Sequence, residues 1–279
     1  MGEARRVAMA IAAHPDDIEF MMAGTLILLG RAGYQLHYLN IANGSCGTVT
    51  LSRDEIVALR AEEARAAARL IGAQHHASLV NDIDIFYERG LLAKVGAIVR
   101  EVNPGILLVP SPEDYMEDHA NSSRLAVSAA FCRGMRNFPT DPHRTPVEGE
   151  VALYHALPYG LHDGVRRGVF PGQYVDVTSV INLKQKMLAQ HRSQKEWLDR
   201  SQGLDAYLKT MVEMAAEVGA MSGRFRYAEG WRRHSHLGFS GPGFDPLAEA
   251  LGEKVFVSRA YEQQLERPPA AETEGAEDG

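Results

Sequence analysis

The sequence predicts an α/β fold of the Rossmann-like type, a three-layer sandwich built around a mostly parallel sheet. Short apolar runs that are typical of buried strands alternate with segments of helical periodicity, which predicts parallel strands joined by right-handed crossovers. The chain has 279 residues, of which 45% are hydrophobic, enough for one large core. No linker-like change of composition divides it. We therefore expect a single domain over residues 1–265.

Apolar runs and turn residues define the first three elements. Residues 7–13 form a continuous apolar run before a polar turn, which is typical of a strand buried on both faces. Residues 20–31 carry apolar side chains at helical spacing, and Gly33 just beyond them is a usual helix stop. Residues 37–42 predict a second strand, which the turn-rich segment "NGSCGT" closes.

A second helix is predicted over residues 52–72. Ser52 and Glu55 have the spacing of a capping box, and apolar residues continue at helical spacing until Gly72. The same reasoning predicts, in chain order, strand 76–80, helix 86–102, strand 105–110, helix 120–132, strands 151–157 and 173–177, and helices 180–194 and 204–218. Residues 230–240 are predicted to form a loop.

Composition argues against several kinds of partner. The formal net charge of -7 argues against nucleic acid, because phosphate contacts need a basic surface. No apolar run approaches the length of a membrane span, and the apolar run near the N-terminus lacks a signal-peptide cleavage site, so we expect a cytoplasmic protein. The 2 cysteines are too few for a disulfide framework. Residues 266–279 lack large apolar side chains and predict a disordered acidic tail.

Two polar loops follow strands that the predicted topology places side by side. In a doubly wound sheet of order 3-2-1-4, ligands bind beyond the carboxyl ends of strands 1 and 4. The first strand leads into His14, Asp16 and Asp17, and the fourth leads into "SPEDYMEDHANSS", which contains Asp114 and His119. We therefore expect two loops rich in metal-ligand side chains to converge on one crevice.

Two imidazoles and one carboxylate form a three-ligand site that leaves positions open for water and substrate, as a hydrolytic zinc requires. We assign His14, Asp17 and His119 to a single Zn²⁺. Asp16 then lies beside the ion as the general base. The competing interpretation is structural, because Asp16 and Asp17 can cap the next helix and Asp118 can cap another.

These segments closely resemble the PIG-L/LmbE-like family of zinc-dependent N-deacetylases. "AHPDDIE" at 13–19, "EDH" at 117–119 and "RAEEARAAARLIG" at 60–72 match the family's motifs in order and spacing. The resemblance implies an LmbE-like fold and hydrolysis of an N-acetyl group on an amino sugar or its conjugate. It also implies that Arg60 contacts the substrate, that Asp82 or the nearby Asp84 does so too, and that the chain can assemble as a homo-oligomer.

One departure from the family pattern concerns the oxyanion. Many members carry a histidine three residues before the last metal ligand, where it stabilises the oxyanion or protonates the leaving amine, but Met116 stands there in this chain. We expect His236, or failing that His234, to replace it, with Tyr115 and Arg60 as weaker candidates. Both histidines also fit a surface loop. Asp118 either orients a catalytic histidine or caps its helix.

Two other functions are compatible with the same residues. His14, Asp16 and His119 also form the two-histidine, one-carboxylate triad of non-haem Fe(II) oxygenases, although that triad is more typical of all-β barrels. A non-catalytic protein that binds a sugar in the crevice is the second alternative. The identity of the substrate is not encoded in any motif that the sequence contains.

Overall fold

The computed structural model describes residues 5–194 and 206–266. Its centre is one sheet of eight strands in the order β3-β2-β1-β4-β5-β7-β6-β8. The strands are β1 (Val7–Ala12), β2 (Gln35–Asn40), β3 (Gln74–His76), β4 (Ile106–Val109), β5 (Ala152–Ala156), β6 (Gln173–Asp176), β7 (Ala228–Arg233) and β8 (Val255–Val257). The pairs β3-β2-β1-β4-β5 are parallel, and β7, β6 and β8 add antiparallel pairs. The predicted order 3-2-1-4 and the α/β fold class are confirmed.

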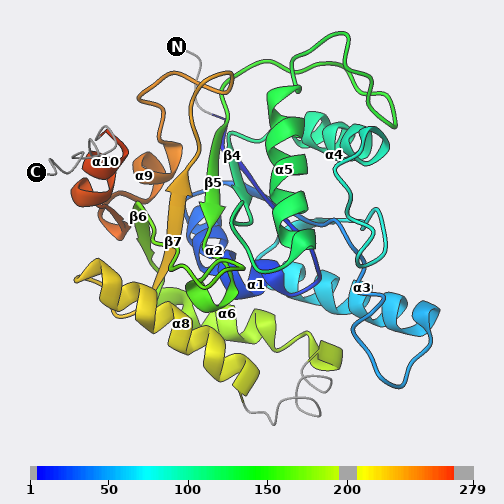
Figure 1. Ribbon diagram of the computed structural model, residues 1–279, viewed down its shortest axis with the longest axis horizontal. Helices are drawn as coiled ribbons and strands as arrows, with labels where there is room; N and C mark the ends of the chain where they lie inside the picture. Colours follow the sequence, from blue (N-terminus) through cyan, green and yellow to red (C-terminus); the bar gives the residue numbers. More distant parts are fainter. Residues whose placement is uncertain (1–4, 195–205, 267–279) are drawn as a thin grey trace, which may run out of the picture.

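Helices cover both faces of this sheet (Figure 1). They are α1 (Asp17–Met21), α2 (Ala23–Arg31), α3 (Arg53–Arg69), α4 (Arg89–Val102), α5 (Glu117–Phe131), α6 (Ile181–Leu188), α8 (Ala206–Ser222), α9 (Pro246–Leu251) and α10 (Arg259–Leu265). Single 3-10 turns lie at Tyr159–Leu161, Thr178–Val180 and Gly252–Lys254. Within the described ranges, no helix is both long enough and apolar enough to cross a membrane.

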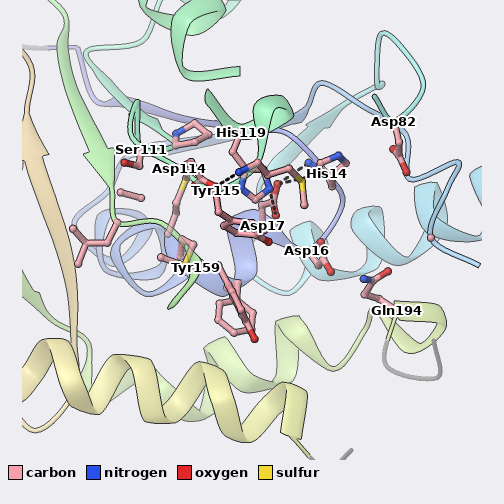
Figure 2. Close-up of a pocket in the computed structure, with 18 of the residues that line it drawn as sticks. His14, Asp16, Asp17, Asp82, Ser111, Asp114, Tyr115, His119, Tyr159 and Gln194 are labelled. Atoms are coloured by element: carbon pink, nitrogen blue, oxygen red, sulfur yellow. Dashed lines mark hydrogen bonds and ion pairs between the residues drawn. The ribbon is translucent and has the colours of Figure 1, made fainter. Parts of the chain in front are cut away.

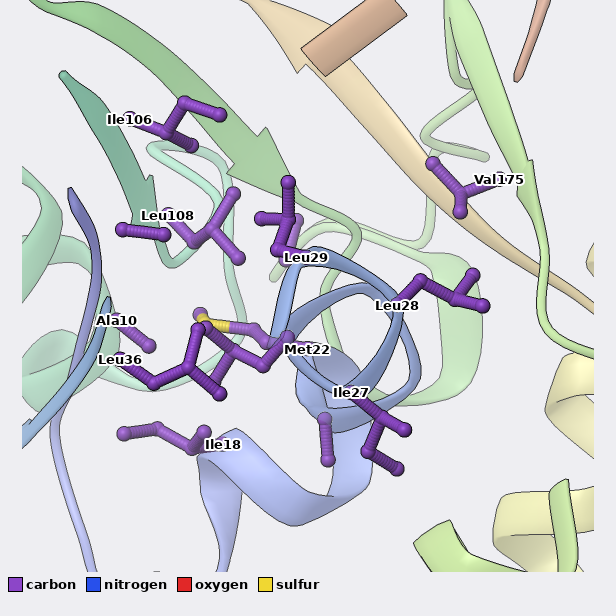
Figure 3. Close-up of a cluster of buried hydrophobic side chains, with 14 of the residues drawn as sticks. Ala10, Ile18, Met22, Ile27, Leu28, Leu29, Leu36, Ile106, Leu108 and Val175 are labelled. Carbon is purple, nitrogen blue, oxygen red and sulfur yellow. The ribbon is translucent and has the colours of Figure 1, made fainter. Parts of the chain in front are cut away.

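The side chains on the two faces of β1 show why helices cover the sheet on both sides and form a three-layer fold. Successive side chains of a strand point to opposite faces, so Ala8 and Ala10 pack on one side, in a cluster to which α2 contributes more buried side chains than any other helix (Figure 3). Met9 and Ile11 pack on the other side with α4 and α5. All four side chains are fully buried, as predicted for the apolar run 7–13.

The predicted helix boundaries hold with small shifts. The capping box of α3 is present, since the Ser52 hydroxyl accepts from the Glu55 amide and the Glu55 carboxylate accepts from the Ser52 amide. The predicted helix 20–31 is instead two helices, α1 and α2, because Met22 leaves the helical region at φ -131. The predicted helix 180–194 is shorter in the structure, where α6 ends at Leu188. The predicted tail lies outside the described residues beyond Glu266.

The prediction of a loop over 230–240 is wrong for its first part. Residues Ala228–Arg233 form β7, which pairs with β5 on one side and β6 on the other. Trp231 is fully buried there and its indole N–H donates to the Thr25 hydroxyl (3.0 Å). Gly230 and the adjacent arginines hide the strand pattern in the sequence, so only tertiary packing identifies it. The structure also adds β8, α9 and α10, which the sequence analysis did not predict.

Candidate metal centre

The loops after β1 and β4 meet at the carboxyl edge of the sheet. His14, Asp17 and His119 each offer one ligand atom, and these atoms all lie within 4.8 Å of one another. Figure 2 shows the three side chains converging between the two loops. Asn40 at the end of β2 fixes this geometry by donating to the backbone carbonyl of His14 (2.6 Å). The predicted convergence of the two loops is therefore present in the fold.

Each imidazole is oriented by a second carboxylate. His14 Nε2 lies 2.9 Å from Asp118 Oδ2, and His119 Nδ1 lies 3.1 Å from Asp114 Oδ1. The remaining nitrogens face Asp17, with His14 Nδ1 at 3.6 Å and His119 Nε2 at 3.4 Å from its carboxylate. Carboxylates behind metal-ligating histidines set the tautomer and ring orientation. This donor set fits a divalent transition metal such as zinc.

The charges around the ligands favour a cation at this point. Burial alone lowers the pKa of His14, but hydrogen bonds to Asp118 and Asp17 outweigh it and raise that pKa to about 9. Burial likewise opposes charge on Asp17, yet the neighbouring His119 and His14 hold its pKa well below the ordinary value. Positive charge between the imidazoles is therefore stabilised by the carboxylates that surround them.

Asp16 is held by two buried side chains. The Tyr207 hydroxyl donates to Asp16 Oδ2 (2.6 Å), and Arg60 Nη2 lies 3.4 Å from Asp16 Oδ1 while also donating to the Pro15 carbonyl. Burial raises the pKa of Asp16, and the Arg60 charge opposes that rise. The Asp16 backbone has φ 111, a conformation that costs a non-glycine residue free energy and recurs at functional sites.

The capping interpretation of these aspartates does not hold. Asp16 is the N-cap residue of α1 by position, but its side chain makes no capping hydrogen bond. The N-cap of α5 is Met116, and Asp118 instead accepts from the Ile83 amide (2.8 Å) and pairs with His14. Asp118 therefore lies behind the candidate ligand His14, consistent with its proposed orienting role.

Arg60 and Asp82 both line the cavity that contains the three ligands, which has a volume of about 520 Å³. The Asp82 carboxylate accepts from the amides of Gly44 (2.7 Å) and Cys46 (2.8 Å), so it also anchors the loop after β2. Asp84, the competing candidate, is exposed and bonds to Asn81. Geometry thus favours Asp82 over Asp84 as the residue that faces a ligand.

The structure does not bring His236 or His234 to the cavity. His236 is half-buried in the loop after β7, where its carbonyl accepts from the Phe239 and Ser240 amides, and neither histidine is among the residues that line the cavity. His234 Nδ1 lies 2.9 Å from His155 Nε2 and its ring meets Phe239 edge-on. The loop runs beside β5, where the His234 amide donates to the Leu153 carbonyl and the Phe239 carbonyl accepts from the Val151 amide.

Four residues that line the cavity were given no role in the sequence analysis. Tyr207 and Gln194 come from a part of the chain where no motif indicates a site, so only the fold reveals them. Asp114 lies within the predicted polar loop, and its spacing of five residues from His119 was the available signal. Tyr159 reaches the cavity from the 3-10 turn after β5.

Comparison with known proteins identifies the fold and the family. Residues 9–130 match the family model "PIG-L: GlcNAc-PI de-N-acetylase". The chain is 30% identical over 237 residues to the diacetylchitobiose deacetylase of Thermococcus kodakarensis, covering 80% of this chain and 81% of that protein. It is also 24% identical over 242 residues to the 4-oxalmesaconate hydratase of Pseudomonas putida, covering 82% and 90% of the two chains.

A solved structure agrees with this assignment. The N,N'-diacetylchitobiose deacetylase of Pyrococcus horikoshii, complexed with its inhibitor MPG, superposes with a TM-score of 0.70 at 25% identity, covering 87% of this chain and 88% of that one. The residues that match the family model include the two loops that carry the three candidate ligands. This protein belongs to the PIG-L/LmbE-like deacetylase family.

Proposed function

We propose that this protein is a zinc-dependent hydrolase that removes the N-acetyl group from an N-acetylated amino sugar of the N-acetylglucosamine type, or from its conjugate. The observation that carries the proposal is the cluster of His14, Asp17 and His119 with Asp16 beside it in one cavity. Membership of a family that contains a diacetylchitobiose deacetylase supports the same reaction.

In this proposal His14, Asp17 and His119 hold one Zn²⁺. A zinc ion so bound lowers the pKa of water and polarises an amide carbonyl. Asp16 accepts the proton from the attacking water at its carboxylate, which Tyr207 and Arg60 hold in place. Asp114 and Asp118 keep the two imidazoles in the tautomers that ligation needs.

The absence of a histidine at position 116 leaves the leaving amine to be protonated by another group. Met116 lines the cavity, and its thioether cannot donate a proton. We assign this step to Asp16, which returns to the amine the proton that it took from water. Hydrolysis then gives acetate and a free amino sugar, and one carboxyl group serves as base and then as acid.

Acetate and amine release tests this function directly. Protein purified without added metal is analysed for bound metals, then assayed with N-acetylglucosamine, diacetylchitobiose and N-acetylglucosamine conjugates, before and after chelation and zinc restoration. We expect zinc-dependent release of equal amounts of acetate and primary amine. The Asp16→Asn variant retains zinc and loses at least 100-fold in turnover, the low end of general-base effects.

The same preparation separates the competing functions. Bound iron with substrate-dependent oxygen uptake would identify an oxygenase, and binding without release under zinc loading would identify a sugar-binding protein. Because one relative is a hydratase, a conjugated unsaturated acid is included and its loss of ultraviolet absorbance is followed. Turnover of that acid with no amine release from any amide would replace the deacetylase proposal.

A further inference from the structure

The cavity has a polar end and an aromatic end. Figure 2 shows Asp82 and Gln194 on one side of the His14, Asp17 and His119 group, with Tyr115 and Tyr159 on the other side. At the polar end, the Arg60 guanidinium, the Asp82 carboxylate and the Gln194 amide belong to residues that line the cavity. A few convergent polar groups in a pocket fix the orientation of a ligand. The polar end therefore suits the hydroxyl groups of a sugar.

The aromatic end is a continuous wall, formed by Tyr115, Tyr159, Phe20 and Tyr207. The Tyr115 ring meets the candidate ligand His119 edge-on at 5.8 Å between centroids, and Tyr159 follows at 6.3 Å. Phe20 lies 5.2 Å from Tyr159 and 5.7 Å from Tyr207, which bonds to Asp16. The wall thus runs from a metal ligand to the partner of the general base.

Part of this wall is open to a ligand. Tyr115 and Tyr159 are 51% and 43% exposed, whereas Phe20, whose ring lies against Tyr159, is 7% exposed. Met21 and Leu157 extend the apolar lining beside Phe20. An accessible aromatic surface inside a concave site gains free energy when a ligand's apolar group covers it.

The geometry of an amide connects the two ends. The carbonyl carbon carries the amino sugar on one side and the acyl group on the other, so a sugar at the polar end directs the acyl group toward the aromatic wall. The methyl group of an acetyl would leave most of that wall uncovered. Resting on the proposed function, we propose that the wall is an acyl subsite, and that the preferred substrates are amino sugars with an N-acyl group longer than acetyl.

The reaction itself is unchanged by this preference. Water adds to the amide carbonyl, the C–N bond breaks, and the products are a carboxylate and the same free amine. Free glucosamine is therefore a common readout for N-acetyl-, N-butyryl-, N-hexanoyl- and N-benzoylglucosamine. Each methylene that reaches apolar surroundings is expected to raise kcat/KM about fourfold, hence roughly 16-fold from acetyl to butyryl.

A second arm of the experiment tests which side of the amide binds the aromatic wall. Phenyl and octyl glycosides of N-acetylglucosamine carry the apolar group on the sugar instead of on the acyl group. A gain for the glycosides without a gain along the acyl series overturns the acyl assignment, as does a flat or falling acyl series. Binding of the N-acetyl and N-butyryl compounds to the Asp16→Asn variant tests the subsite separately from turnover. Tighter binding of the butyryl compound to this variant, together with no amine release by the zinc-loaded wild type, would sustain the subsite while the proposed function fails.

Variants of Tyr159 test the wall itself. Tyr159→Ala removes the ring and is expected to bring the ratio of kcat/KM for the butyryl and acetyl substrates close to one, whereas Tyr159→Phe keeps that ratio. Phe170→Ala is the matched control, because Phe170 is 60% exposed and does not line the cavity. A ratio that is unchanged in Tyr159→Ala contradicts the proposal, and a partly unfolded variant does not obscure it because both substrates meet the same enzyme.

Discussion

Asp16 carries its carboxylate on a backbone conformation that few residues other than glycine adopt. Two buried side chains contact this carboxylate, Tyr207 at 2.6 Å and Arg60 at 3.4 Å. A general base must lie within hydrogen-bond reach of the proton it takes, so the direction of this carboxylate decides its efficiency. Tyr207 is therefore a positioning residue for the proposed reaction.

Replacing Tyr207 by phenylalanine tests that role. We expect kcat to fall about tenfold or more with little change in KM, because a hydrogen bond to a charged group contributes roughly 1.5–3 kcal/mol. Steady-state kinetics with zinc-loaded protein measure the two constants. Tyr174→Phe is the matched control, since Tyr174 is also buried and its hydroxyl has no partner in the part of the chain that is described. Equal effects of the two variants on kcat would contradict the role of Tyr207.

In the proposed site, Asp118 lies behind the candidate metal ligand His14. Its carboxylate lies 2.9 Å from His14 Nε2, on the side of the ring away from Asp17. We expect Asp118→Ala to weaken zinc binding by about 10- to 100-fold, because partners of this kind orient the ligating imidazole. Competition with a chromophoric chelator gives the dissociation constant. Asp84→Ala, an exposed carboxylate near the same loop, should leave zinc affinity unchanged.

At the scale of elements, β7 shows how a strand that the sequence hides can organise a helix. Its Glu229 is buried and accepts from the backbone amides of Gly24 and Thr25, each at 2.7 Å, at the start of α2. Lys184 of α6 donates to the same carboxylate at 2.6 Å, and both side chains are 2% exposed. One carboxylate thus joins β7, α2 and α6.

Removing the charge of Glu229 should destabilise the fold strongly. Glu229→Gln leaves the Lys184 ammonium buried without a counter-charge, and breaking such a pair costs about 3–5 kcal/mol. Urea unfolding measures the free energy of unfolding for this variant. The double variant Glu229→Gln, Lys184→Met should recover part of the loss because it removes the unpaired charge. A single variant as stable as the wild type would show that the pair contributes nothing.

At the scale of the molecule, the sequence predicted the parallel half of the sheet, whose strands are buried apolar runs separated by helices. The order 3-2-1-4 follows from alternating strands and helices, and it alone was enough to bring His14, Asp17 and His119 together. The antiparallel half follows no such rule, so β7 and β8 were missed. Long-range contacts of single side chains were equally hidden, which is why Tyr207 was not foreseen and His236 was expected in a cavity that it does not line.

His155 links the stability of the whole molecule to pH. It lies on β5, it is 5% exposed, and its ring nitrogens contact the Pro110 carbonyl and His234. Burial lowers the pKa of His155 to about 4, against an ordinary value of 6.5. The folded state therefore binds fewer protons than the unfolded state between these values. Its contribution to stability is fully present above pH 6.5 and is lost as the pH falls toward 4.

The zinc-loaded wild type should accordingly lose about 2 kcal/mol of unfolding free energy through His155 between pH 7 and pH 5. Urea unfolding across this range, compared with His155→Gln, isolates the contribution, because glutamine does not titrate. The variant is expected to show a shallower dependence on pH, whatever its absolute stability. His143→Gln, which replaces an exposed histidine, serves as the control and should keep the wild-type slope. Parallel pH curves for the wild type and His155→Gln would show that His155 is not the group whose protonation destabilises the fold in acid.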